Sequence, residues 1–66
     1  MKIGEKIREL RIQERLSQSE LAQIVQVSSS TVNYWEHNIN EPKACYIISL
    51  VKAFQITFDE FFEYVE

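Results

Sequence analysis

The 66-residue sequence is poor in the residues that carry most metal and redox chemistry, with one cysteine and one histidine. Cys45 has no second cysteine with which to form an internal disulfide, and one cysteine with one histidine cannot supply a zinc site. No apolar run approaches the ~18 residues of a membrane-spanning helix, and no charged-then-apolar leader is present. We therefore expect a cytoplasmic protein without a membrane span, a metal or a cofactor.

The groups needed for catalysis are missing in other respects as well. There is no nucleophile with a partner base and acid, and no glycine-rich phosphate loop. His37 is interpreted as an exposed residue at a helix end rather than a ligand or a base, and Cys45 as a small helix residue rather than a redox sensor. A chain of this length has little room beyond one small core, so no small-molecule effector site is expected. The sequence indicates a binding protein and not an enzyme.

What the sequence does contain is a series of apolar stripes at helical spacing, with helix-start signals between them. Ser17 with Glu20, and Thr57 with Glu60, have the three-residue separation of a capping box. Pro42 is typical of the first turn of a further helix. The stripes are expected to form one core, from Ile3, Ile7, Leu10, Leu21, Val25, Val32, Trp35, Ala44, Ile47, Leu50, Val51 and Phe54.

The segment from residue 17 to residue 37 carries the functional signal. Residues 18–25 have the pattern of a short helix, and Ser28 is an N-cap that begins another helix after a tight break. In that second helix only Val32 and Trp35 form an apolar stripe, so its other side chains face solvent, and most of them can donate and accept hydrogen bonds. Two short helices with such an outward polar surface predict a helix that enters a DNA groove.

On these residues the chain resembles the Cro/C1-type helix-turn-helix family, which includes the lambda repressor-like domains. The resemblance covers nearly the whole chain and implies one all-α domain over residues 1–66, with the helix-turn-helix formed by the second and third helices. The matching pieces are IGEKIRELR, LSQSELAQ, VSSSTVNYWE, the EP of Glu41 and Pro42, and ITFDEFF. The five helices are placed at about 2–14, 18–25, 29–37, 43–54 and 58–65.

The resemblance also implies which residues touch DNA. Gln18 would bond a phosphate at the positive end of its helix, with an ordinary exposed glutamine as the alternative. Ser29 and Ser30 align with base-reading positions, and Asn33 and Tyr34 follow one turn later. We favour Asn33 and Tyr34 for discrimination, because asparagine can contact adenine in bidentate fashion whereas serine has a short reach.

Residues around the ends of that helix are assigned to the DNA backbone. Thr31 would touch a phosphate, and Ser28 is first a helix cap. Asn38, Asn40 and Lys43 lie where family members commonly hold the backbone. For Asn38 a structural role is an equal alternative, because asparagine tolerates the left-handed conformation that ends helices.

Two further features follow from the resemblance. Arg11 and Glu36 match a pair that ties the first helix to the recognition helix. Glycines that are common at the helix junctions are replaced here by other residues. A left-handed conformation at each such junction, except at an asparagine, would cost about 1 kcal/mol. This cost predicts a marginal monomer stabilised by dimerisation. The replacing residues are Arg15, Gln26, Asn38 and Gln55.

The last predicted helix indicates how two copies would associate. Phe58 and Phe61 match family positions that pack on the core, whereas Phe62, Tyr64 and Val65 are predicted to form a homodimer interface. A simple cover for the core is the alternative. Two-fold symmetry would set two recognition helices about 34 Å apart, which matches a palindromic operator.

The charge balance limits the mode of DNA binding. The formal net charge is −3, which is unusual for a DNA-binding protein. Residues 1–36 carry five basic and five acidic groups, whereas residues 37–66 carry two basic and five acidic groups. Non-specific affinity should therefore be weak. The predicted function is a transcriptional regulator that acts as a repressor. The alternatives are an antitoxin, a restriction-modification controller, or an interaction module with weak or no DNA binding.

Overall fold

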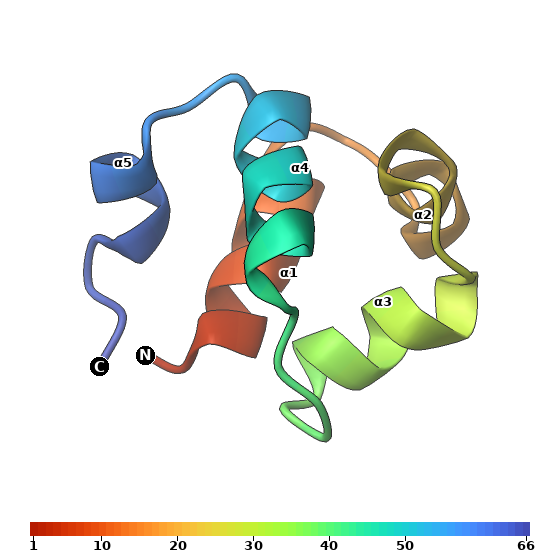
Figure 1. Cartoon of the computed structure of the whole chain (residues 1–66), viewed down its shortest axis with the longest axis horizontal. Helices are drawn as coiled ribbons and strands as arrows, with labels where there is room; N and C mark the ends of the chain where they lie inside the picture. Colours follow the sequence, from red (N-terminus) through yellow and green to blue (C-terminus); the bar gives the residue numbers. More distant parts are fainter.

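The computed structural model describes residues 1–66 and consists of five helices without strands. They are α1 (Ile3–Gln13), α2 (Gln18–Val25), α3 (Ser29–Glu36), α4 (Ala44–Phe54) and α5 (Phe58–Phe62). Helices α1 and α4 lie between the α2–α3 pair on one side and α5 on the other (Figure 1). The all-α, five-helix prediction is confirmed, and the first four helices end within one residue of their predicted bounds. None of the helices is long and apolar enough to cross a membrane.

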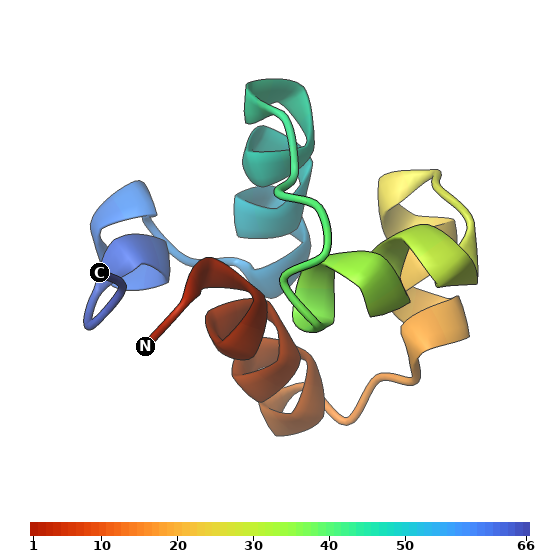
Figure 2. The same ribbon diagram turned by 90° about the horizontal axis from the view of Figure 1, so that it is seen from below.

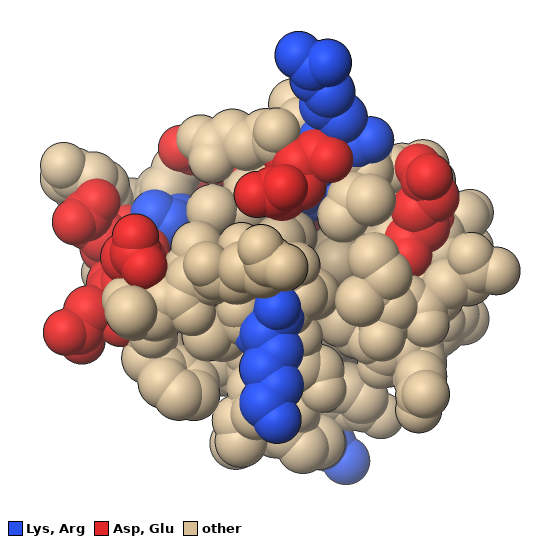
Figure 3. All heavy atoms as spheres, turned by 90° about the horizontal axis from the view of Figure 1, so that it is seen from above, with Lys and Arg blue, Asp and Glu red and all other residues tan.

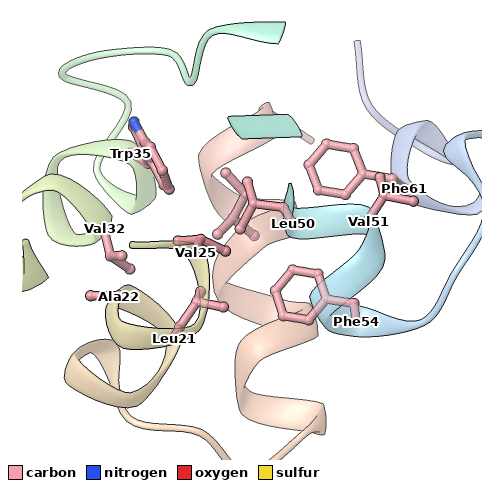
Figure 4. Packing of buried hydrophobic residues seen from close by; sticks show 10 residues of the cluster. Leu21, Ala22, Val25, Val32, Trp35, Leu50, Val51, Phe54 and Phe61 are labelled. Carbon is pink, nitrogen blue, oxygen red and sulfur yellow. The ribbon is translucent and has the colours of Figure 1, made fainter. Parts of the chain in front are cut away.

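A single apolar core joins all five helices. Figure 4 shows its side chains converging from α2 and α3 on one side and from α4 and α5 on the other. The buried members are Ile7, Leu21, Ala22, Val25, Val32, Trp35, Leu50, Val51, Phe54 and Phe61. Two sequence predictions fail here. Ala44 is exposed at the start of α4, and Phe58, predicted to pack on the core, is 50% exposed. Both residues lie in the first turn of a helix. The interior is filled instead by residues further along the same helices, Leu50 in α4 and Phe61 in α5.

The predicted caps are present at the starts of α2 and α5. The Ser17 backbone N–H donates to Glu20 Oε1 at 2.8 Å, and the Glu20 N–H donates back to Ser17 Oγ at 3.0 Å. Thr57 and Glu60 repeat the arrangement at 2.8 and 3.1 Å. These backbone hydrogen bonds lower the pKa of both glutamate carboxyls. Both caps are therefore intact at neutral pH, and they weaken only in acid as the carboxylates protonate.

Helices α1 to α4 all end in the same Schellman arrangement. In each, a left-handed residue lies one or two positions after the last helical residue, and the residue after it donates its N–H to the carbonyl five residues back. Those donor–acceptor distances run from 2.9 to 3.2 Å, and the donors are Leu16, Val27, Ile39 and Ile56. The left-handed residues are Arg15, Gln26, Asn38 and Gln55, with φ of 57–62°. The predicted strained junctions are confirmed, and an apolar residue follows each of them.

Gln26→Gly is expected to raise the melting temperature by several degrees. The left-handed backbone of Gln26 costs about 1–2 kcal/mol, which exceeds the ~0.4–1 kcal/mol of extra chain entropy that glycine loses on folding. Thermal unfolding followed by circular dichroism measures the change. Gln23→Gly, at an exposed site inside α2, is the matched control and should lower the melting temperature. An unchanged or lower value for Gln26→Gly would show that the glutamine contributes something other than strain.

The only glycine in the chain lies where α1 approaches the end of α3. The Gly4 N–H donates to Asn38 Oδ1 at 3.0 Å. A Cβ at this position would lie 2.0 Å from the Trp35 carbonyl oxygen and 2.6 Å from Asn38 Oδ1. The two helices therefore approach closely only because residue 4 has no side chain. This role of Gly4 was not predicted from the sequence, although a lone glycine inside a helix is a signal of close packing.

The last helix is shorter than predicted. It ends at Phe62 and not at residue 65, because Glu63 is extended and Tyr64 is left-handed with φ of 66°. Continuing the helix would place Glu63 and Glu66 at its negative end, where acidic side chains are unfavourable. Val65 therefore lies beyond the helix and off its apolar stripe.

The residues after α5 are held by the N-terminal segment instead. The Met1 amino group donates to the Tyr64 carbonyl at 2.8 Å, and Lys6 Nζ donates to the Glu63 carbonyl at 3.0 Å. The Glu66 N–H donates in turn to the Met1 carbonyl at 3.0 Å. These partners lie 57 to 65 residues apart in the chain. A pattern read over a few residues does not contain such pairings.

Candidate nucleic-acid interface

Helix α3 presents a polar surface along its length. Figure 2 shows it crossing the lower face of the molecule, with α2 behind it. Val32 and Trp35 are buried, whereas Ser29, Ser30 and Tyr34 are exposed. These three side chains are directed to solvent without hydrogen bonds to the rest of the chain. They are the freest hydrogen-bonding groups on the helix.

The start of α3 is organised by Ser28. Its Oγ accepts the Thr31 backbone N–H at 3.1 Å and lies 2.9 Å from Thr31 Oγ1. The capping role predicted for Ser28 is present. Because the two hydroxyls bond each other, both are partly occupied before any ligand arrives.

The loop from α3 to α4 adds an open groove beside the helix. It has a volume of about 510 Å³ and is lined by Thr31, Trp35, Ile39, Asn40, Glu41, Lys43 and Tyr46. The Trp35 and Tyr46 rings pack with centroids 5.5 Å apart and form its apolar base. Thr31, Asn40 and Lys43, which sequence analysis assigned to the DNA backbone, are thus brought together.

Asn38 is directed elsewhere. Its side-chain oxygen accepts the Gly4 N–H, and its backbone is left-handed with φ of 58°. Of the two roles considered from sequence, the structural one is the role that its contacts describe. The amide group serves as a cap for α1, which sequence analysis did not identify because the two residues are 34 positions apart.

A nearly buried ion pair links α1 to the end of α3. Arg11 Nε and Nη2 donate to the two oxygens of Glu36 at 2.6 and 3.1 Å, and Nη1 donates to the Leu16 carbonyl at 2.8 Å. The side chains are 12% and 1% exposed. The hydrogen bond to Glu36 raises the pKa of the Arg11 guanidinium further above neutrality. The pair holds the orientation of α3 through a charge-assisted, two-point contact.

Gln18 belongs to the same network. Its Nε2 donates to Glu36 Oε1 and to Asn33 Oδ1, both at 3.1 Å. Neither sequence interpretation of Gln18 describes this arrangement, since its side chain is half-buried and both of its N–H donors are used within the protein. Asn33 is also half-buried, and its side-chain oxygen is bonded to Gln18 of α2.

The charges around this interface are sparse. No lysine or arginine occurs between Arg15 and Lys43, so α2 and α3 carry no basic side chain. Acidic side chains gather at the α5 end of the molecule, as Figure 3 shows for the face seen from above. The acidic residues at this end are Asp59, Glu60, Glu63 and Glu66. The surface around α3 relies on neutral hydrogen-bonding groups.

Comparisons with known proteins agree with this geometry. A helix-turn-helix family model matches residues 7–61. The P22 c2 repressor protein in complex with a synthetic operator is 31% identical, with 92% of each chain covered and a TM-score of 0.85. The DNA-binding domain of that repressor in solution has a TM-score of 0.86 at the same identity, covering 92% of this chain and 80% of that one.

A third structure has a different biological role. The restriction-modification controller protein C.AhdI from Aeromonas hydrophila is 32% identical, with 91% of each chain covered and a TM-score of 0.85. A search of the curated proteins found no match. The family match spans most of the chain, and the five helices superpose on lambda repressor-like domains along nearly their whole length. This chain belongs to the Cro/C1-type helix-turn-helix family of DNA-binding transcriptional regulators.

Proposed function

We propose that this protein is a repressor that binds a palindromic operator as a homodimer. The observation that carries the proposal is the exposed polar surface of α3, held in place by the ion pair of Arg11 with Glu36. The similarity to a repressor seen with its operator supports this choice. A restriction-modification controller is the second candidate, supported by the equal similarity to C.AhdI. We assign neither a catalytic activity nor a small-molecule effector.

Helix α3 would enter the major groove with Ser29, Ser30, Asn33 and Tyr34 toward the base edges. Thr31, Asn40 and Lys43 would flank it on the DNA backbone, since all three line the groove beside α3. The contribution of Gln18 to phosphate binding would come from its backbone N–H at the start of α2. Few cations take part, so specific binding should depend less steeply on salt than for a basic protein.

Fluorescence-anisotropy titration against the DNA upstream of the protein's own gene tests the proposal. We expect saturable binding to this duplex and weak binding to a scrambled one, at two salt concentrations. Tyr34→Ala and Asn33→Ala should each weaken specific binding by about 1–3 kcal/mol, the range for one good base contact.

Gln13→Ala is the control for that titration, because Gln13 is exposed on the side of α1 that faces the tail after α5. It should leave the affinity unchanged. Equal, weak binding of the wild type to both duplexes would contradict the proposed function and favour a protein partner.

The proposed dimer interface lies at the α5 end. Phe62 is 43% exposed and Tyr64 is 79% exposed, next to the half-buried Val65. Large exposed apolar side chains in one place mark an association surface. The acidic residues around them would approach one another across a two-fold axis, so moderate salt should favour the dimer by screening their repulsion.

Phe62→Glu is expected to convert the dimer to a monomer. It adds a fifth acidic side chain to Asp59, Glu60, Glu63 and Glu66 at the α5 end, and it removes the apolar contact. Sedimentation equilibrium at several protein concentrations measures the change. Ile24→Glu is the matched control, since Ile24 is an exposed apolar residue on α2, and it should leave the association constant unchanged. A wild-type protein that sediments as a monomer at high concentration would contradict the dimer, as would a Phe62→Glu variant that still dimerises.

A further inference from the structure

The network behind α3 has a defined direction of hydrogen bonding, which starts at Glu36. This carboxylate is ion-paired with Arg11 and only 1% exposed, and an ionised carboxylate can only accept hydrogen bonds. The Gln18 amide atom at 3.1 Å from Glu36 Oε1 must therefore be the N–H donor. The opposite amide orientation would place two oxygens against each other. Chemistry alone thus selects which way the Gln18 amide points, although oxygen and nitrogen are otherwise easily exchanged.

The same reasoning then orients Asn33. The second hydrogen of Gln18 Nε2 points to Asn33, where the atom at 3.1 Å must be an acceptor, namely Oδ1. The Asn33 Nδ2 group makes no hydrogen bond within the protein. Since no buried side-chain nitrogen or oxygen lacks a partner, Nδ2 reaches solvent. Gln18 therefore fixes which end of the Asn33 amide is directed inward.

We infer that Gln18 is a positioning residue that makes Asn33 present its two N–H donors to the DNA bases, so that Asn33 selects guanine rather than adenine. This inference rests on the proposed function. The major-groove edge of guanine offers two acceptors, N7 and O6, whereas adenine offers one acceptor and one donor. A bidentate contact with adenine requires Asn33 Oδ1 to face the bases, whereas its hydrogen bond with Gln18 directs this oxygen inward. The adenine contact expected from sequence is thereby replaced by a guanine contact.

Selection of binding sites from randomised duplexes tests the inference, with wild type and two variants. Asn33→Asp is nearly isosteric and keeps an oxygen toward Gln18, but it presents only acceptors outward. It should select cytosine, which offers the N4 donor, at the position where wild type selects guanine. Its affinity for the wild-type site should fall at least about tenfold. Gln18→Leu removes the constraint, so Asn33 can rotate, and the guanine preference should relax toward adenine.

Two controls separate this effect from loss of folding. Thermal unfolding establishes that both variants are folded at the assay temperature. Gln13→Ala alters an exposed side chain of α1 outside the proposed interface and should leave the preference at the Asn33 position unchanged. A change in base preference at one position is a readout that general destabilisation of α3 would not produce.

The outcomes distinguish the inference from the proposed function. A wild-type protein that selects a defined site with adenine at this position, or an Asn33→Asp variant with an unaltered selected site, would overturn the inference and leave the proposed function standing. No selected sequence at all would overturn both. In the free protein, amide-proton exchange gives an independent check: Gln18 side-chain protons that exchange as fast as those of the exposed Gln23 would also overturn the inference.

Discussion

Glu36→Ala is expected to destabilise the protein by about 3–5 kcal/mol, because it leaves the Arg11 guanidinium nearly buried without its carboxylate. The variant also removes the acceptor for Gln18 Nε2, so three hydrogen bonds are lost together. A domain of this size has a stability of roughly 3–10 kcal/mol in total. The variant is therefore expected to be largely unfolded at 37 °C, as measured by urea denaturation followed by circular dichroism.

Two further variants make the Glu36 result interpretable. Glu41→Ala removes an exposed carboxylate and should change the free energy of unfolding by less than about 0.5 kcal/mol. The double variant Arg11→Met with Glu36→Leu replaces the pair by apolar side chains and should recover much of the loss, because no unpaired charge remains. A loss below about 1 kcal/mol for Glu36→Ala would show that solvent compensates Arg11.

Gly4→Ala should also be strongly destabilising, although alanine is the better helix former. Helix propensity alone predicts a gain of about 1 kcal/mol. The added Cβ would, however, lie 2.0 Å from the Trp35 backbone carbonyl, which cannot move without shifting the end of α3. Such overpacking costs typically about 1–3 kcal/mol, and the hydrogen bond from the Gly4 N–H to Asn38 would be lost in addition. We expect a net loss of about 2 kcal/mol.

The sign of the Gly4→Ala change decides between the local and the tertiary explanation. Thermal unfolding should show a fall of roughly ten degrees or more. Gln13→Ala, an exposed position at the end of the same helix, should raise the melting temperature slightly or leave it unchanged. If Gly4→Ala also raised it, the close approach of α1 to α3 would not be a constraint on the fold.

Predictions made from the sequence succeeded where the determining contacts are local. The Ser17 and Thr57 caps depend on a residue three positions away, and both are present. The left-handed residues at the helix ends were also predicted, since the family pattern indicates where each helix stops. Predictions failed for Ala44, Phe58 and the end of α5, where the outcome depends on how much interior remains and on the N-terminal segment.

The candidate interface divides in the same way. The pattern of α3 indicated that Ser29, Ser30 and Tyr34 face solvent, because two apolar residues define its inner face. It was wrong for Thr31 and Asn33, which are half-buried. The resemblance implied that Arg11 and Glu36 form a pair. It did not imply that Gln18 lies between Glu36 and Asn33, nor that Asn38 bonds Gly4. Those contacts join residues 15 to 34 positions apart.

The sequence by itself determined that this is an all-α helix-turn-helix chain, where four of its helices begin and end, and which surface of α3 is polar. Periodicity and caps act over one helical turn, so a short stretch of residues contains them in full. Only the tertiary structure decided the direction of the Asn33 amide, the need for glycine at residue 4 and the point where α5 ends. Each of these depends on a donor, an acceptor or an occupied volume supplied by a distant part of the chain.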